Sequence, residues 1–366
     1  MAEYDVVIIG AGPAGSSAGK AAAEWGLKAL ILEEHRAIGI PRHCPGRLQG
    51  SSFTEEILAS LAPSIVLTRY RLRRVYGPSG RLVQEFSIEG RGCCAVLRDE
   101  FDRELARQAA RAGAELRLNT RVTGLLREER QVRGVVTASR GLPQVYGKVV
   151  IAADGLRSIL TGISHQEALA GPGEEPIPGI LLELVGVRDL EPNVTELHLG
   201  AFSQNRPRAT LWPTGPTSGF IAFDSLAVFE KIKAGDYLLS RKIRDAVPIQ
   251  MNGFAQSSGW GHALPRTVKD NLMLVGNAAG YTGIVHAIVS GRYAGEVAAT
   301  AIKEGDVSEG ALSRYEELCR HLGLHLTGRD GAALGKLSGL SDQDIEQLLP
   351  EMAQRGELNY LDQLPF

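Results

Sequence analysis

Four residues near the N-terminus have the types and spacing of a dinucleotide site. Gly10, Gly12 and Gly15 form a GxGxxG pattern directly after the apolar run YDVVII, and Glu33 follows roughly 20 residues later. The first glycine of such a pattern permits a tight turn, the second lets the backbone approach a pyrophosphate, and the third lets a helix pack on the sheet. A carboxylate at that distance accepts hydrogen bonds from a ribose. These residues therefore predict dinucleotide binding, with NAD and FAD both open.

The elements around these residues are those that a dinucleotide site requires. Residues 4–9 are a β-branched run typical of a buried parallel strand, 16–25 are small and Ala-rich as in a tightly packed helix, and 27–32 form a second strand. The N-terminus of the helix would supply N–H groups and partial positive charge to the pyrophosphate. This order of elements makes the prediction much more specific than the glycines alone.

Composition excludes several other classes of protein. The length of 366 residues fits two or three domains, and the formal net charge of -2 argues against a nucleic-acid partner. The four cysteines include no CxxC pair, so we expect neither a structural metal nor a disulfide framework. No stretch approaches the length of about 18 apolar residues that spans a membrane, and the N-terminus lacks the basic region of a signal peptide. We expect a cytoplasmic protein and leave peripheral contact with a membrane surface open.

Motifs along most of the chain resemble the geranylgeranyl reductase family, flavoproteins that share the fold of para-hydroxybenzoate hydroxylase. The matching segments are YDVVIIGAGPAG with LILE, RDEFDRELARQAARAGAEL, AADGLRS, and GNAAG before AIVSGRYAGEVAATAI. The segment IGIPRHC at 38–44 is similar to the IGxPxxC segment of the reductase branch. The resemblance implies an α/β fold with a Rossmann-like FAD-binding domain, an antiparallel-sheet substrate domain and a small helical C-terminus.

The resemblance also implies a discontinuous domain organisation. The expected FAD-binding domain comprises residues 1–70, 92–160 and 265–318, the substrate domain 71–91 and 161–264, and the helical C-terminal segment 319–366. In the last segment, Ser341 and Asp344 have the spacing of a capping box at the start of a helix.

The resemblance implies that the cofactor is FAD, and it also implies which residues bind that cofactor. The expected cofactor-binding residues are Gly10, Gly12, Ala14, Gly15, Glu33, Arg42, Cys44, Arg98, Val122, Asp154, Gly276, Asn277, Gly283 and Ile284. Trp212 and Pro213 are expected in the wall of the substrate pocket. Cys44 matches a cysteine on the active-site face of the flavin, and it is the expected catalytic proton donor.

Two features of the chain depart from the family pattern near the flavin. Asn277 stands where the family normally has Asp, which removes a charge but keeps a hydrogen-bonding carbonyl. The segment 276–285 is several residues shorter than in the family. His286, at the start of the next helix, is then either a hydrogen-bond donor near the flavin or a surface residue.

The favoured function is flavin-dependent reduction of carbon–carbon double bonds in a polyprenyl lipid. An isolated alkene lacks an electron-withdrawing group, so hydride from reduced flavin needs a proton delivered to the other carbon. The expected partners are an apolar polyprenyl-type substrate and an electron donor, NAD(P)H or ferredoxin. Two alternatives stay open: an FAD-dependent aromatic hydroxylase, and a degenerate flavoprotein or lipid-binding protein without catalysis, suggested by Asn277 and the short segment.

Overall fold

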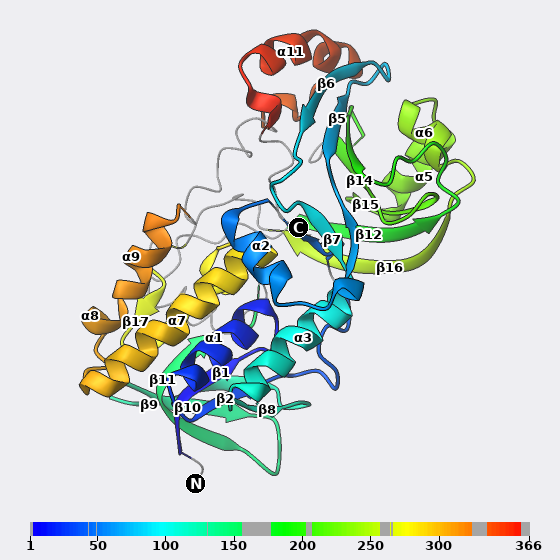
Figure 1. The fold of residues 1–366 in the computed structure, drawn as a ribbon. Coiled ribbons are helices and arrows are strands. Elements are labelled where there is room, and N and C mark those ends of the chain that lie inside the picture. Colours follow the sequence, from blue (N-terminus) through cyan, green and yellow to red (C-terminus); the bar gives the residue numbers. More distant parts are fainter. Residues whose placement is uncertain are drawn as a thin grey trace. The chain divides into compact units, whose positions relative to one another are not determined.

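The chain folds into two compact units, each assembled from three separate stretches of sequence (Figure 1). In the computed structural model the described residues are 3–42, 44–48, 50–129, 131–155, 177–202, 207–256, 264, 266–323 and 335–359. The first unit consists of Met1–Ile40, Asp99–Glu174 and Gly261–Thr327, and the second of Pro41–Arg98, Glu175–Trp260 and Gly328–Phe366.

The first unit is built on a mostly parallel sheet with β1 near its centre. Strand β1 pairs in parallel with β2 and β11, β11 pairs in parallel with β18, and β2 with β8. Its strands are β1 (Glu3–Ile9), β2 (Ala29–Leu32), β8 (Glu115–Arg117), β9 (Val122–Glu128), β10 (Gln131–Thr137), β11 (Gln144–Ala152), β17 (Val268–Lys269) and β18 (Leu272–Leu274). The central strands are buried β-branched runs, as expected where both faces of a sheet are covered.

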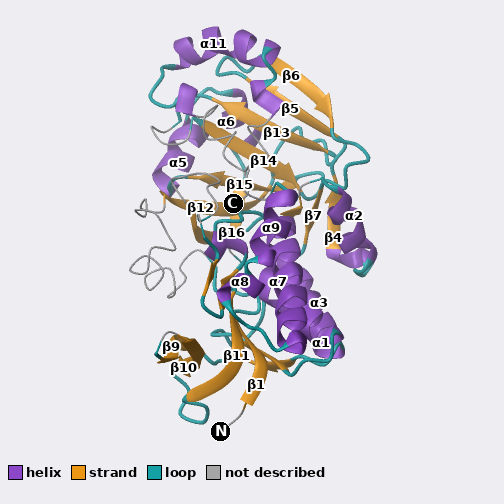
Figure 2. Cartoon of the chain, turned by 90° about the vertical axis from the view of Figure 1, so that its left-hand side faces the viewer, coloured by secondary structure: helices purple, strands orange, loops and turns teal. Residues whose placement is uncertain are grey.

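Helices cover one face of this sheet, and the β9–β10 hairpin continues the sheet from β11 on the opposite side. Figure 2 shows α1, α3 and α7 together on one side of β1 and β11, with the β9–β10 hairpin on the opposite side. The helices of this unit are α1 (Pro13–Glu24), α3 (Arg98–Arg111), η2 (Gly276–Ala279), α7 (Ile284–Glu304), α8 (Glu309–Leu312) and α9 (Arg314–His321). Helices α1 and α7 approach so closely that a methyl group on Gly291 would lie 2.0 Å from the carbonyl oxygen of Ala14.

The second unit is built on a seven-stranded sheet in the order β16-β12-β15-β14-β13-β5-β6, antiparallel except between β13 and β5. Its elements are β3 (Arg47–Leu48), α2 (Ser52–Ala59), η1 (Pro63–Ile65), β4 (Val66–Arg69), β5 (Leu72–Tyr76), β6 (Leu82–Ser87), β7 (Cys94–Val96), β12 (Ile177–Val185), β13 (Val194–Leu199), β14 (Arg208–Pro213), β15 (Ser218–Phe223), α5 (Leu226–Ala234), α6 (Leu238–Ile243), β16 (Val247–Gln256), α11 (Asp342–Gln354) and η3 (Glu357–Asn359).

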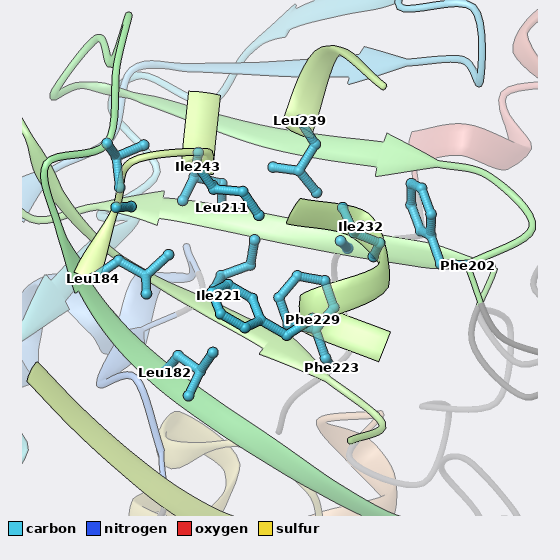
Figure 3. Packing of buried hydrophobic residues seen from close by; sticks show 13 residues of the cluster. Leu182, Leu184, Phe202, Leu211, Ile221, Phe223, Phe229, Ile232, Leu239 and Ile243 are labelled. Atoms are coloured by element: carbon cyan, nitrogen blue, oxygen red, sulfur yellow. The ribbon is translucent and has the colours of Figure 1, made fainter. Parts of the chain in front are cut away.

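Hydrophobic clusters cover both faces of the seven-stranded sheet. On one face, Phe229 and Ile232 of α5 and Ile243 of α6 pack against strand residues such as Leu211 and Ile221 (Figure 3). On the other face, α11 packs on β5 and β13, and Tyr70 and its neighbours pack on β14 and β15. Ser341 caps α11 in a capping box with Asp344, which confirms that sequence prediction.

The α/β fold with a Rossmann-like part and an antiparallel sheet is confirmed, while the divisions along the chain differ from the expected ones. Residues 41–70 and 92–98, expected with the cofactor domain, belong to the second unit instead, where β3, β7 and β4 form a small sheet of their own. Contacts between segments distant in the chain set that division, so motif order alone does not reveal it. Within the described ranges, no helix has the length and apolar character needed to cross a membrane. Four residues of the quoted motifs, His43, Leu156, Arg157 and Ser158, lie outside the described residues.

Candidate functional site

The glycine loop between β1 and α1 is a turn in which two glycines are required by the fold. Gly10 has φ +95°, and a methyl group there would lie 2.6 Å from the carbonyl oxygen of Ala153. A methyl group on Gly15 would lie 1.9 Å from the carbonyl oxygen of Gly10. Both side chains must therefore be absent for the strand and the helix to approach each other.

Gly12 differs from these two glycines, because the fold does not require it. Its φ of -69° and ψ of -175° suit any residue, and a methyl group there would meet nothing within 4 Å. Gly12 caps α1 without a side-chain hydrogen bond, and among the described residues the N–H groups of Ala14 and Gly15 have no acceptor. The open space in front of free N–H groups fits the pyrophosphate of a dinucleotide.

Glu33 ties the end of β2 to the glycine loop. Its Oε2 accepts a hydrogen bond from the backbone N–H of Ala11 at 2.8 Å, and its Oε1 accepts one from the N–H of His35 at 2.9 Å. The His35 Nδ1 also lies 2.6 Å from Oε1. A carboxylate has about four lone-pair sites, so Glu33 can still accept hydrogen bonds from a ribose. Sequence reasoning missed His35, since its contact depends on how the loop after β2 folds back.

The structure brings two further predicted residues to the same region. Thr120, two residues before Val122, donates its backbone N–H to the carbonyl of Glu33 at 2.8 Å. Asp154 lies two residues after the end of β11, and its Cα would lie 3.3 Å from a methyl group on Gly10. Val122, the first residue of β9, thus lies near Glu33, and Asp154 lies beside the glycine turn.

The segment between β18 and α7 adjoins the first turn of α1. Gly276 has φ +57°, and a methyl group there would lie 3.0 Å from the Cβ of Ala14. Its N–H donates to the Oγ of Ser290 at 3.0 Å, which fixes the turn against α7. Asn277 is half-buried, and within the described part of the chain its side chain has no hydrogen-bond partner.

Helix α7 begins in the same way as α1, with a glycine at its N-cap. Gly283 has φ +106° and caps the helix without a side-chain hydrogen bond. In the described chain, no acceptor is found for the N–H groups of Ile284 and Val285. The unit therefore has two neighbouring helix N-termini with free N–H groups, those of α1 and α7.

Three predicted cofactor residues belong to the second unit. Arg42 lies on the seven-stranded sheet, with its Nη1 3.3 Å from Glu183 Oε2 and its guanidinium 5.9 Å from the centre of the Phe220 ring. Arg98 is the first residue of α3, and its Cγ would lie 3.1 Å from a methyl group on Gly46. The roles of these residues toward a cofactor stay predictions.

Cys44, the third of them, is the most accessible of the four cysteines. It is half-buried, whereas Cys93, Cys94 and Cys319 are buried, and all four are free thiols. Burial raises the pKa of Cys94 and of Cys319 to about 12, which keeps both protonated and unreactive at neutral pH. Cys44 is therefore the cysteine best suited to exchange a proton.

Trp212 and Pro213 lie in the second unit behind a groove of about 860 Å³. Trp212 is fully buried and packs in one cluster with Tyr70 and Cys93, both of which line the groove. The Tyr70 hydroxyl donates to the carbonyl of Pro213 at 3.0 Å. The other apolar walls include Leu58, Leu61 and Val66. Trp212 thus supports the wall of a groove that it does not itself line, and its pocket role stays a prediction.

Comparisons with known proteins agree with this arrangement. The family described as FAD dependent oxidoreductase matches residues 91–294, and that described as Pyridine nucleotide-disulphide oxidoreductase matches residues 4–171. A digeranylgeranylglycerophospholipid reductase of Methanocella arvoryzae is 34% identical over 86% of this chain and 82% of its own length.

Solved structures share the fold along nearly the whole chain. A geranylgeranyl bacteriochlorophyll reductase-like protein from Thermoplasma acidophilum superposes with a TM-score of 0.84 at 26% identity, covering 99% of this chain and 96% of its own. A probable FAD-dependent monooxygenase from Pseudomonas aeruginosa, with a TM-score of 0.67 at 16% identity over 98% and 99% of the two chains, shares the fold alone. The FAD family match over more than half the chain and the 34% identity show that it belongs to the FAD-dependent oxidoreductases of the geranylgeranyl reductase family.

Proposed function

We propose that this protein reduces isolated carbon–carbon double bonds in the geranylgeranyl chains of a glycerophospholipid-type lipid. The observation that carries the proposal is the 34% identity, over 86% of the chain, to a reductase named for such a lipid. Bound FAD, once reduced, supplies hydride to a carbon of the double bond. The fold alone would not separate this function from hydroxylation, since a probable monooxygenase shares it.

The first unit would hold the cofactor by its glycine loop and its two helix N-termini. The open face of Gly12 and the N–H groups of Ala14 and Gly15 would bind the pyrophosphate, and Glu33 the adenosine ribose. Asn277, whose side chain is free of other partners in the described chain, would donate or accept a hydrogen bond toward the middle of the cofactor.

Cys44 is the proposed proton donor of the reaction. As hydride forms a C–H bond at one carbon, the π bond breaks and its electrons take the proton of the Cys44 thiol at the other carbon. The resulting thiolate regains a proton from water. This proposal is supported by the partial exposure of Cys44, which the three buried cysteines lack.

The partners of the proposed reaction are a reductant and the lipid itself. NAD(P)H and ferredoxin are the two candidate reductants, and anaerobic mixing of each with the oxidised holoprotein distinguishes them by which one bleaches the flavin. Because the proposed lipid resides in bilayers, we also propose peripheral contact with a membrane surface. Sedimentation with lipid vesicles, compared with the protein alone, tests that contact.

Substitution of Cys44 tests the proton donor. We expect C44S to bind FAD normally and to lose about 100-fold or more in turnover of a geranylgeranyl lipid, a typical loss for a general acid. The matched control is C319A, which removes a buried thiol and should keep turnover. Undiminished turnover by C44S with flavin bound would exclude Cys44 as the donor. Oxygen consumption coupled to oxidation of NAD(P)H, with no saturated lipid formed, would favour the aromatic hydroxylase over the reductase.

A further inference from the structure

The α1–α7 packing shows which way the two helix N-termini are offset. Methyl groups on Gly291 and Gly295 would lie 2.0 Å and 2.4 Å from the carbonyl oxygens of Ala14 and Ala18, respectively. Both helices advance by four residues between these contacts, so they run in the same direction. Gly291 is the eighth residue of α7 and Ala14 the second of α1. At 1.5 Å per residue, α7 therefore extends about 9 Å beyond the start of α1.

This offset indicates where the two halves of the proposed cofactor would lie. The pyrophosphate belongs at the N-terminus of α1, and Glu33 places the adenosine ribose beside the glycine loop. The remaining half of FAD carries the flavin away from the pyrophosphate. The projecting start of α7 is then the part of the first unit that extends toward the flavin half.

His286 lies in this projecting turn in a single tautomer. It is the third residue of α7, and its Nδ1 lies 2.8 Å from the carbonyl oxygen of Thr282. A carbonyl oxygen only accepts, so Nδ1 carries the proton and Nε2 has a lone pair. Burial lowers the pKa of His286 below its ordinary value of 6.5, which keeps the ring neutral at pH 7.

The groups at this helix start complement one edge of a flavin. The pyrimidine edge of the flavin presents a carbonyl, an N–H and a second carbonyl. The start of α7 offers backbone N–H donors at Ile284 and Val285, which have no acceptor within the described residues, and one acceptor at His286 Nε2. We propose that His286 contacts the cofactor, its Nε2 accepting a hydrogen bond from the flavin N3–H.

The proposal rests on the FAD-binding part of the proposed function. It also explains how the short 276–285 segment could still offer a hydrogen-bond acceptor to the flavin. Only Thr282 and Gly283 separate Tyr281 from α7, so few backbone groups are available there. The imidazole both fixes the carbonyl of Thr282 and supplies an acceptor that backbone N–H groups lack.

Two substitutions of His286 separate these two tasks. The amide of Asn can take the position of Nδ1 and keep the bond to Thr282, whereas the longer amide of Gln can reach the position of Nε2. We expect H286N to weaken FAD binding about 10-fold, the effect of one lost hydrogen bond, and to raise the flavin midpoint potential. H286Q should stay within about 3-fold of the unaltered protein in FAD affinity. Titration with FAD and anaerobic potentiometry measure both quantities without turnover, and H321N, at the end of α9, is the control.

The outcomes are distinct. Unchanged affinity and potential in both variants would overturn the contact. Normal affinity in H286N with a loss in H286Q would also overturn it, because His286 would then act only through Thr282. Failure of the unaltered protein to bind FAD would overturn the proposed function itself, and this inference with it.

Discussion

Gly12 and Gly15 belong to one motif but are needed for different reasons. A methyl group on Gly15 would collide with the carbonyl of Gly10, so that glycine is needed for the protein to fold. A methyl group on Gly12 would enter open space in front of α1. The conservative change to alanine therefore separates the requirement of the fold from the requirement of the ligand.

We expect G12A to fold normally and to lose FAD affinity by about 10-fold or more, because the added methyl group occupies the space through which the backbone approaches a pyrophosphate. The measurements are thermal unfolding without FAD and titration with FAD. G124A is the matched control, since a methyl group on Gly124 also meets nothing within 4 Å but lies in β9. Equal FAD affinity in the two variants would place the pyrophosphate elsewhere.

At this scale the sequence predicts local features and misses those that need the folded chain. The glycines and Glu33 follow from the order of strand, loop and helix. The contact of Arg42 with Glu183 does not, because the two residues are 141 positions apart in the sequence. Nor does the tautomer of His286, which depends on one carbonyl at the entrance of α7.

Helices α1 and α7 are held together by backbone contact at glycine. The small residues of both helices indicate close packing in the sequence, but nothing there identifies the two helices as partners. Gly291 lies buried against Ala14, so an added methyl group must push the helices apart. The start of α1, which carries the proposed pyrophosphate site, would shift with them.

We expect G291A to lower the free energy of unfolding by about 2 kcal/mol, because overpacking outweighs the helix propensity that alanine adds. Urea denaturation without FAD measures it. G310A is the control: Gly310 also lies in a helix, α8, but its nearest neighbour would be 3.9 Å from the methyl group. A stability of G291A equal to that of G310A would contradict the close approach of the two helices.

In the second unit, a buried charged cluster joins β13 to α6. Lys242 Nζ lies 2.9 Å from Glu196 Oε1, and His198 Nε2 lies 3.0 Å from Glu196 Oε2. Burial alone would raise the pKa of Glu196, but the hydrogen bond from His198 and the charges of His198 and Lys242 lower it below its ordinary 4.5. The ionised Glu196 therefore stabilises the fold above pH 4.5, and this stabilisation is lost as pH falls through the lowered pKa.

We expect K242M to lower the free energy of unfolding by about 3 kcal/mol at neutral pH, because Glu196 stays buried with one cation fewer. The loss should shrink as the pH falls below 4.5, where Glu196 takes up a proton. Urea denaturation across the acidic range measures both effects. K231M, which alters an exposed lysine of α5, should stay within about 0.5 kcal/mol of the unaltered protein. A loss that does not vary with pH would exclude Glu196 as its cause.

Over the whole molecule, the sequence predicts the class of fold better than it predicts which segments belong to which of the two units. The Rossmann-like part is recognisable because its signals lie within 34 consecutive residues. The second sheet is assembled from strands before and after the stretch 99–174, and residues 41–70 join the second unit, not that sheet, through contacts that no local pattern reveals. Two units made of three stretches each can fold only after distant segments have met.

The central claim is that flavin bound by this protein passes its electrons to the double bond of a polyprenyl lipid. The most direct test is to reduce the FAD-bound protein anaerobically, mix it with a geranylgeranyl glycerophospholipid, and follow the flavin absorbance and the mass of the lipid. We predict reoxidation of the flavin together with a gain of two hydrogens per double bond. Flavin that stays reduced beside unchanged lipid, and is reoxidised only when oxygen is admitted, would contradict the claim.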